Sequence, residues 1–297
     1  MKKTSIITAY NREKIFFNTL KKLKKCKNYD QFKKLIIYQD VKNSIVKKIK
    51  KIDPEIEILK TKYPKKMTGL QKCNLNTYKG FKKSFEDYGS DYVIYLEDDV
   101  LPSYDFLEYH NSIISRYRYD KKFFSANSFS KDYKKNLNFS YSKFIYGIGK
   151  GFSISSEKWN ILDKMYKELF FTKKNIFYDC YFEADITRKY FVVMPHRSRC
   201  LEQASNGLNS TIDQKNSDHW VKWKKSFLSS NTYKIKDYTF KPNMKYSWRS
   251  DCLQYSILNI LKTKLRFLMI KEKIKEIIKD IIGYKNFFLI KKFIQKF

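Results

Sequence analysis

The sequence predicts an α/β fold, in which a mainly parallel β-sheet is flanked by helices and is followed by a helical C-terminal tail. Three observations carry this prediction. Strand-like apolar runs alternate with helical patterns over the first hundred residues, three of these runs end in polar residues, and residues 252–297 have apolar residues at helical spacing. Strands that alternate with helices are typical of parallel sheets. Such sheets bind ligands outside the carboxyl ends of their strands.

The individual elements follow from short sequence patterns. Runs rich in β-branched and other apolar residues predict strands at 4–10, 35–38, 56–59 and 92–96. Apolar residues spaced three or four positions apart predict helices at 15–23, 43–50 and 70–87. Polar residues stand directly after three of the strands: Asn11 and Arg12, then Gln39 and Asp40, then Glu97, Asp98 and Asp99.

Composition excludes several classes of protein. The chain has 297 residues, of which 42% are hydrophobic and 18% aromatic, and this is too apolar for a disordered chain. With only 8 Gly and 5 Pro, it is neither collagen-like nor of low complexity. No apolar stretch is long enough for a membrane-spanning helix, and the N-terminus lacks a secretory pattern. The five cysteines form no C-x-x-C pair, so we expect reduced thiols in a cytoplasmic protein.

The charge balance is strongly basic, with 62 Lys+Arg against 30 Asp+Glu and a net charge of +32. Only 8 of the basic residues are Arg, although Arg is the residue suited to bidentate contacts with phosphates and guanine. The abundance of Lys, Asn and Ile indicates an A+T-rich coding sequence, which accounts for about half of the excess charge. The remainder is available for an acidic partner, such as a nucleotide or an anionic membrane surface.

Three adjacent acids, Glu97, Asp98 and Asp99, follow the predicted strand 92–96 directly. Carboxylates at this spacing repel one another, so the arrangement is costly unless a cation offsets it. Mg²⁺ and Mn²⁺ prefer carboxylate oxygens together with phosphates and water. The cluster therefore predicts a divalent-metal site that can also hold a diphosphate. A solvated acidic turn is the alternative.

The segment from Tyr95 to Tyr109, which includes these acids, resembles the acidic metal motif and following helix of the N-acetylglucosaminyltransferase I-like enzymes. These are inverting glycosyltransferases of the GT-A fold. Shorter segments resemble other parts of the family in the same order, at 9–12, 37–40, 144–152, 177–181 and 195–207. The resemblance covers residues 4–215. It departs from the family's pattern at Cys180 and Asn206, where the family has a second acid and a histidine.

The resemblance implies a chemistry and a metal site. A nucleoside diphosphate sugar, with a UDP-sugar favoured, would give its sugar to an acceptor hydroxyl with inversion. Asp99 would be the direct ligand of Mn²⁺ or Mg²⁺, and the metal would stabilise charge on the leaving diphosphate. Asp98 and Glu97 would meet the ribose and the donor sugar.

Further residues acquire roles from the same resemblance. The remaining nucleotide-sugar contacts would come from Ala9, Tyr10, Arg12, Asp40, Gly147 and Gly149. Within this set, Arg12 would contact the diphosphate and Asp40 the base. Asp179 would be the general base that removes the acceptor proton, with Glu183 and Asp185 as alternatives. The structural alternatives are a solvated turn residue for Arg12, a helix N-cap for Asp40 and a surface residue for Asp179.

We divide the chain into a GT-A catalytic domain at 1–215, a connector at 216–251 and a basic amphipathic helical tail at 252–297. Residues 262–297 contain 11 Lys/Arg and 3 Asp/Glu beside an apolar stripe, which is typical of a helix that lies on an anionic membrane. The alternative is that this stripe packs against the core or a second subunit. We expect a peripheral enzyme on the inner face of the cytoplasmic membrane, which acts on a glycan or lipid-linked acceptor in bacterial surface-glycan synthesis.

Other functions stay open at this stage. A nucleic-acid-binding protein with Lys and aromatic surfaces would account for the charge, although not for acids at strand ends. A nucleotidyltransferase also uses strand-end carboxylates and metal, but it would consume nucleoside triphosphates. A noncatalytic membrane scaffold would rest on the tail alone. No P-loop, dinucleotide fingerprint or nucleophile elbow is present in the sequence.

Overall fold

The computed structural model describes residues 1–129, 140–144, 151–171, 189–203 and 239–240. All of them belong to one unit, which extends from Met1 to Pro242. The strands are β1 (Lys3–Tyr10), β2 (Lys33–Gln39), β3 (Glu57–Thr61), β4 (Tyr92–Glu97), β5 (Val100–Pro102), β6 (Phe123–Asn127), β7 (Ser140–Phe144), β8 (Phe152–Ser155), β9 (Phe191–Pro195), β10 (Cys200–Glu202) and β11 (Thr239–Phe240).

Helices connect most of the early strands, as the sequence pattern predicts. The α-helices are α1 (Glu13–Lys24), α2 (Asn43–Ile52), α3 (Gly69–Lys82), α4 (Phe106–Tyr117) and α5 (Trp159–Phe171). Shorter helical turns are η1 (Tyr29–Gln31), η2 (Lys83–Asp87) and η3 (Ser156–Lys158). Helix α3 begins with a capping box, in which the side chains of Thr68 and Gln71 each accept a hydrogen bond from the backbone N–H of the other residue.

Nine of the described strands form one sheet, in the order β11-β7-β9-β6-β8-β4-β1-β2-β3. The pairs among β4, β1, β2 and β3 are all parallel, with Ile7 opposite both Ile36 and Leu96. β8 runs antiparallel between β4 and β6. The prediction of a mainly parallel α/β fold is therefore confirmed, and the antiparallel pairings of β8 with its two neighbours and of β7 with β9 are additions that were not predicted.

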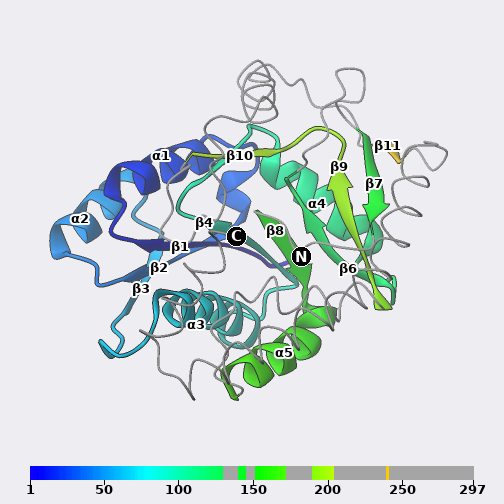
Figure 1. Ribbon diagram of the computed structural model, residues 1–297. Helices are drawn as coiled ribbons and strands as arrows, with labels where there is room; N and C mark the ends of the chain where they lie inside the picture. Colours follow the sequence, from blue (N-terminus) through cyan, green and yellow to red (C-terminus); the bar gives the residue numbers. More distant parts are fainter. Residues whose placement is uncertain (130–139, 145–150, 172–188, 204–238, 241–297) are drawn as a thin grey trace, which may run out of the picture. The chain divides into compact units, whose positions relative to one another are not determined.

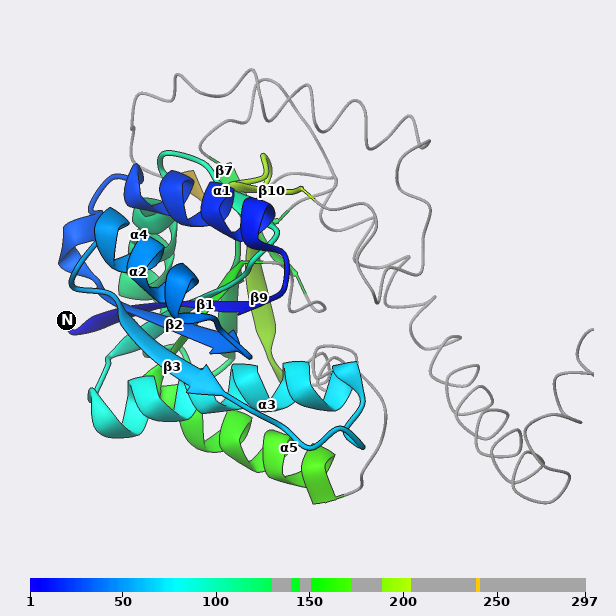
Figure 2. The same cartoon turned by 90° about the vertical axis from the view of Figure 1, so that its left-hand side faces the viewer.

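The sheet has a hydrophobic core on each face. Neighbouring residues of β4 alternate between them, since Ile94 packs with α1, α2 and α4 while Val93 and Tyr95 pack with α3 and α5. Figure 2 shows these two helical layers on opposite sides of the sheet. Helix α3 approaches closely at Gly80, where an added Cβ would lie 2.9 Å from a methyl carbon of Ile37. Burial on both faces explains why these strands read as continuous apolar runs.

A second, two-stranded sheet joins distant parts of the chain above the carboxyl end of β4. In it, β10 pairs antiparallel with β5, so that Glu202 lies opposite Val100. A fully buried ion pair anchors this sheet, with Arg199 Nε 2.8 Å from a carboxylate oxygen of Asp105. Ser103 donates a hydrogen bond to the other oxygen of that carboxylate at 2.7 Å. The strand that follows the acidic cluster is thus held by a segment a hundred residues later.

The predicted domain boundaries at 215 and 251 stay predictions. Strand β11 falls inside the predicted connector, and it pairs with β7 in the main sheet. The predicted tail at 252–297 lies outside the described residues. In the described part of the chain, no helix combines the length and apolar character that a membrane crossing needs.

Candidate functional site

The acidic cluster lies at the carboxyl end of β4, beside the carboxyl end of β1. Asp98 and Asp99 form the turn between β4 and β5, and their residues are 3% and 5% exposed. Glu97, the last residue of β4, is half-buried. The sequence shows polar residues after three predicted strands, and the parallel pairing of β1 with β4 brings two of these three sets together.

Arg12 is the counter-ion of the two aspartates. It is the N-cap residue of α1, and its guanidinium forms ion pairs with both carboxylates, at 2.9 Å from Asp99 Oδ2. The backbone N–H of Tyr10 also faces Asp98, 3.4 Å from Oδ2. Arg12 is therefore not a solvated turn residue. It supplies the positive charge that the adjacent acids require when no metal is present.

The electrostatics of the pair favour a proton or a cation on Asp98. Burial raises the pKa of Asp98 to about 6 and the neighbouring Asp99 adds to the rise, while Arg12 and the Tyr10 N–H act against it. A buried carboxylate with a raised pKa is common at functional sites. Asp98 is thus a group whose charge depends on what binds beside it.

Asp99 has one oxygen to offer a ligand. Its Oδ2 accepts from Arg12, whereas its Oδ1 is buried and has no hydrogen-bond partner. A buried carboxylate oxygen without a partner is unfavourable, and a hard cation would satisfy it. Within the described residues, no group of three or more His, Cys, Asp and Glu side chains could hold a metal by itself. The residues therefore fit a metal that takes most of its ligands from phosphate and water, as Mg²⁺ commonly does.

Two residues for which no role was predicted form hydrogen bonds to the backbone of the acidic turn. Thr19 Oγ1 donates to the carbonyl of Asp98 at 2.8 Å, and the Gln203 N–H donates to the carbonyl of Asp99 at 2.8 Å. Gln203 Nε2 also donates to Thr19 Oγ1 at 2.8 Å. The polar residue Thr19 on the otherwise apolar face of α1 was the signal that could have identified this contact.

Two backbone conformations near the same edge are unusual. Asn11 has φ of 32° and Asp40 has φ of 52°, both in the left-handed region that few residues other than Gly adopt. They stand directly after β1 and β2. Asp40 is exposed and accepts a 3.1 Å bond from Gln39 Nε2. Because α2 has Lys42 as its N-cap, the alternative reading of Asp40 as a helix cap is wrong. Residues other than Gly with positive φ are enriched at functional sites, where the surrounding structure maintains the strained conformation.

A polar network lies beneath this edge, between the sheet and α3. Tyr95 OH bonds to Thr8 Oγ1 at 2.8 Å and to Thr77 Oγ1 at 3.2 Å. Asn76 Oδ1 accepts from Thr61 and Tyr63. No role was predicted for these residues, although polar side chains on the buried side of a helix are a signal in the sequence that marks them.

Several predicted site residues lie outside the described part of the chain. These are Gly147, Gly149 and the base Asp179, together with the alternatives Glu183 and Asp185. Of the described ones, Ala9 is buried and Tyr10 is 40% exposed at the end of β1. The structure thus brings together Tyr10, Arg12, Asp98 and Asp99. The donor-sugar and acceptor sides of the predicted site stay predictions.

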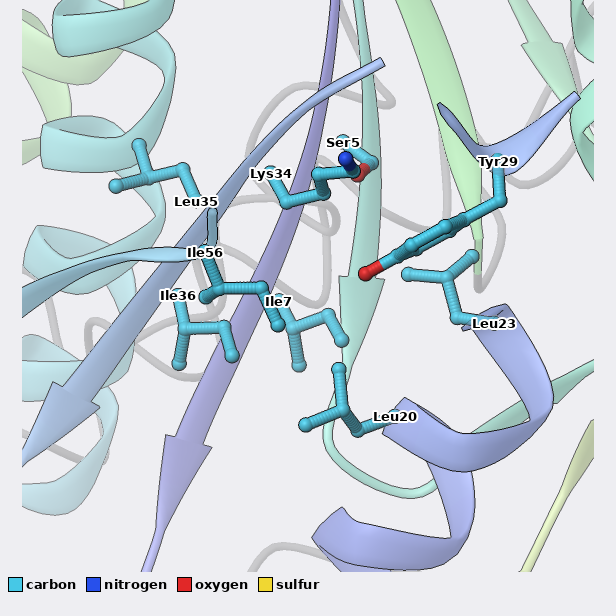
Figure 3. A pocket seen from close by; sticks show the side chains of 9 residues that line it. All are labelled: Ser5, Ile7, Leu20, Leu23, Tyr29, Lys34, Leu35, Ile36 and Ile56. Atoms are coloured by element: carbon cyan, nitrogen blue, oxygen red, sulfur yellow. The ribbon is translucent and has the colours of Figure 1, made fainter. Parts of the chain in front are cut away.

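A small cavity lies elsewhere, between α1 and the amino-terminal halves of β1 and β2 (Figure 3). Its lining is mostly apolar, with Ser5, Tyr29 and Lys34 as the polar exceptions. Lys34 is buried and pairs with Glu55 at 2.7 Å, and Tyr29 donates to Asp53 at 2.7 Å. None of the acidic-edge residues lines this cavity, so it is separate from the candidate site.

The sequence matches no family model, and no curated protein matches it significantly. Among solved structures, the chain is similar to a mannosyltransferase from Pyrobaculum calidifontis in complex with GDP-Man and Mn²⁺, at 13% identity and a TM-score of 0.43. That likeness covers 68% of this chain and 56% of the mannosyltransferase, so the chain spans little more than half of its length.

The chain is also similar to two structures of S. aureus TarS 1–349. For one, the identity is 10% and the TM-score 0.47, over 77% of this chain and 72% of that chain. For TarS in complex with UDP-GlcNAc, the identity is 11% and the TM-score 0.45, over 77% of this chain and 73% of that chain.

Proposed function

We propose that the chain is a metal-dependent glycosyltransferase of the GT-A fold, which transfers a sugar from a nucleoside diphosphate sugar to an acceptor hydroxyl with inversion. The observation that carries the proposal is the buried pair Asp98 and Asp99 at the carboxyl end of β4, with one oxygen of Asp99 unpartnered. The resemblance of residues 95–109 to the acidic motif of N-acetylglucosaminyltransferase I-like enzymes supports the same reading.

Asp99 is the residue we assign to the metal, which is Mn²⁺ or Mg²⁺. When bound, this ion supplies a positive charge that stabilises the leaving diphosphate. The unpartnered Oδ1 of Asp99 is the natural donor, and Asp98 lies next to it for a hydroxyl of the ribose. Glu97 extends the row toward the donor sugar. The three consecutive carboxylates would thereby bind the metal and the hydroxyl groups of a nucleoside diphosphate sugar.

Arg12 has two uses in this proposal. Without ligand, its guanidinium neutralises Asp98 and Asp99. With a divalent cation at Asp99, the acids no longer need it, and the guanidinium is free to form charge-assisted bonds to a diphosphate. The same residue therefore keeps the empty site stable and binds substrate when the site fills.

Several features remain proposals with sequence support alone. They are Asp179 as the general base, Gly147 and Gly149 near the donor sugar, Asp40 on the base, and a UDP-sugar as the donor. We also propose that the tail at 252–297 binds an anionic membrane, which would place the enzyme on the inner face of the cytoplasmic membrane. A glycan or lipid-linked acceptor in bacterial surface-glycan synthesis fits this location.

The proposal is tested by calorimetric titration of the full chain with UDP, GDP and their sugar conjugates, with Mn²⁺ and with chelator. We expect one nucleoside diphosphate to bind in a metal-dependent manner, and its sugar conjugate to be hydrolysed slowly or transferred. Consumption of a nucleoside triphosphate with release of pyrophosphate would instead identify a nucleotidyltransferase. Absence of nucleotide binding, together with salt-sensitive binding to DNA, would contradict both.

A further inference from the structure

Helices α1 and α2 lie side by side on one face of the sheet (Figures 1 and 2). Lys48 of α2 pairs with Glu13 of α1 at 2.6 Å, and Lys24 of α1 bonds to the carbonyl of Ile52. The two helices together contain eight lysines and one glutamate, a net of +7. On the opposite face, α3, η2 and α5 contain six lysines and four acids, a net of +2.

The difference in net charge between the two faces of the sheet is not explained by the lysine-rich composition of the whole chain. A lysine-rich composition affects both faces of the sheet equally, since both come from the same chain. On the opposite face the lysines have acidic partners four residues away, as in Lys82 with Glu86 and Lys167 with Asp163. Helices α1 and α2 contain a single acid, Glu13, which pairs with Lys48 on the neighbouring helix and with no lysine of its own helix. The surplus of positive charge is therefore specific to the face that α1 and α2 cover.

Six lysines define what we call the lysine face: Lys14, Lys21, Lys22, Lys25, Lys47 and Lys51. All six are exposed, and none makes an ion pair or a side-chain hydrogen bond with another described residue. With 100° between successive residues, they lie opposite the buried positions of their helices, such as Leu20 and Ile49. Because both helices rest on the same face of the sheet, these lysines point the same way.

We propose that the lysine face is a docking surface for an anionic lipid bilayer. Lysine side chains are flexible point charges, and fluid lipid headgroups can move to meet them without a fixed spacing. Neither helix contains Arg, the residue suited to phosphate and guanine readout in nucleic acids. Large exposed apolar side chains for stacking on bases are also missing there, since those of the described residues are Met1, Tyr10, Tyr104 and Tyr119.

The expected binding is purely electrostatic. Without an apolar anchor on the lysine face, the contact is reversible and weakens as salt rises, because screening shortens the reach of each charge. This surface lies within the folded domain and is distinct from the proposed tail. The inference does not depend on the transfer reaction, although a membrane surface is where a lipid-linked acceptor would be found.

The test compares two triple variants of the full chain with the same loss of charge. Lys21→Gln, Lys47→Gln and Lys51→Gln remove half of the lysine face. The control replaces Lys82, Lys164 and Lys167 by Gln on the opposite helices. Binding is measured by cosedimentation with vesicles of phosphatidylcholine and phosphatidylglycerol at low salt. We expect affinity to fall on the order of 100-fold in the first variant and less than about threefold in the control.

Three further measurements make the outcome decisive. Thermal unfolding should be alike in both variants, which shows that a loss of binding is not a loss of fold. High salt should abolish the difference between them, and vesicles of phosphatidylcholine alone should bind both variants to the same extent. Equal loss in both variants would mean that net charge alone attracts the bilayer, and the proposal would be wrong. If the wild type binds duplex DNA but no vesicle, the surface serves a nucleic acid instead.

Discussion

The hydroxyl of Thr19, inside α1, donates a 2.8 Å hydrogen bond to the main-chain carbonyl of Asp98. Gln203, just after β10, donates its N–H to the carbonyl of Asp99 and its side-chain amide to the same Thr19 hydroxyl. The acidic turn is therefore held by its backbone, from two directions. Its carboxylates are not needed to keep the turn in place, and they remain available for a ligand.

Replacement of Thr19 by Val should weaken metal-dependent nucleotide binding about tenfold, with a loss of stability of about 1–2 kcal/mol. The methyl group keeps the packing of α1, but it cannot donate to Asp98 or accept from Gln203. Thr19→Ser restores the hydroxyl and should recover most of the affinity. If the Ser variant is as weak as the Val variant, the hydrogen bonds are not what positions the turn. Titration calorimetry with Mn²⁺ and the nucleotide measures the affinity, and urea unfolding measures the change in stability.

Asp99→Ala should abolish transfer and remove the metal dependence of nucleotide binding, because the cation loses its proposed protein ligand. Residual nucleotide affinity should then be the same with Mn²⁺ and with chelator. Glu86→Ala, an exposed acid on the opposite face of the sheet, is the control and should change neither property. Full activity in Asp99→Ala, with metal still required, would contradict the assignment.

Arg12→Gln should lower the melting temperature most when metal is absent. The substitution leaves two buried carboxylates without their counter-ion, and such a loss costs a few kcal/mol in a buried site, less here because Arg12 is partly exposed. Excess Mn²⁺ should raise the melting temperature of the variant more than that of the wild type. Equal shifts in both proteins would show that the cation binds away from the two aspartates. Thermal scans with chelator and with Mn²⁺ measure this directly.

Asp179→Asn should leave donor binding intact and reduce turnover by roughly 10²–10⁴-fold, the usual contribution of a general base. Donor affinity should barely change, since the carboxylate is assigned to the acceptor side. Glu183→Gln and Asp185→Asn are the matched comparisons. Should one of these show the loss of turnover instead, the base is that residue and not Asp179.

His110 should make stability depend on pH. It is fully buried, its Nδ1 lies 2.8 Å from Ser153 Oγ, and burial lowers the pKa of His110 to about 3. Below about pH 6.5 the His110 imidazole is protonated in the unfolded chain but stays neutral in the folded chain. The free energy of unfolding therefore falls as pH drops, by up to about 1.4 kcal/mol per pH unit.

Asp98 acts in the opposite direction, since its raised pKa of about 6 makes the folded state bind a proton first, and stability is lost as pH rises from about 4 to 6. Because both proteins contain Asp98, its contribution cancels when the unfolding free energy of His110→Asn is subtracted from that of the wild type. The gap in unfolding free energy between the wild type and His110→Asn should narrow as pH falls from 7 to 4.5 in urea titrations. A gap that stays constant with pH would mean that His110 is not held neutral by the fold.

Much of the fold was predictable because it is local. The strands at 4–10, 35–38 and 92–96 are recognisable as runs rich in β-branched and aromatic residues. Their side chains contribute to the hydrophobic cores on both faces of the sheet. The acids at the end of β4 were predictable as a site for the same reason, since three adjacent carboxylates after an apolar strand are visible without any partner. That the ends of β1 and β4 meet depends on the strand order in the sheet, which the sequence pattern does not specify.

The order of the elements, the burial of the central strands on both faces and the position of the acidic turn can therefore be read from the sequence. The residues that surround that turn come from distant parts of the chain. Arg12 meets Asp98 across 86 residues, and Gln203 meets Thr19 across 184. The insertion of antiparallel β8 between β4 and β6 and the pairing of β10 with β5 are of the same kind. A periodic pattern records which face a residue presents, whereas its distant partner depends on how all the strands order themselves in the sheet.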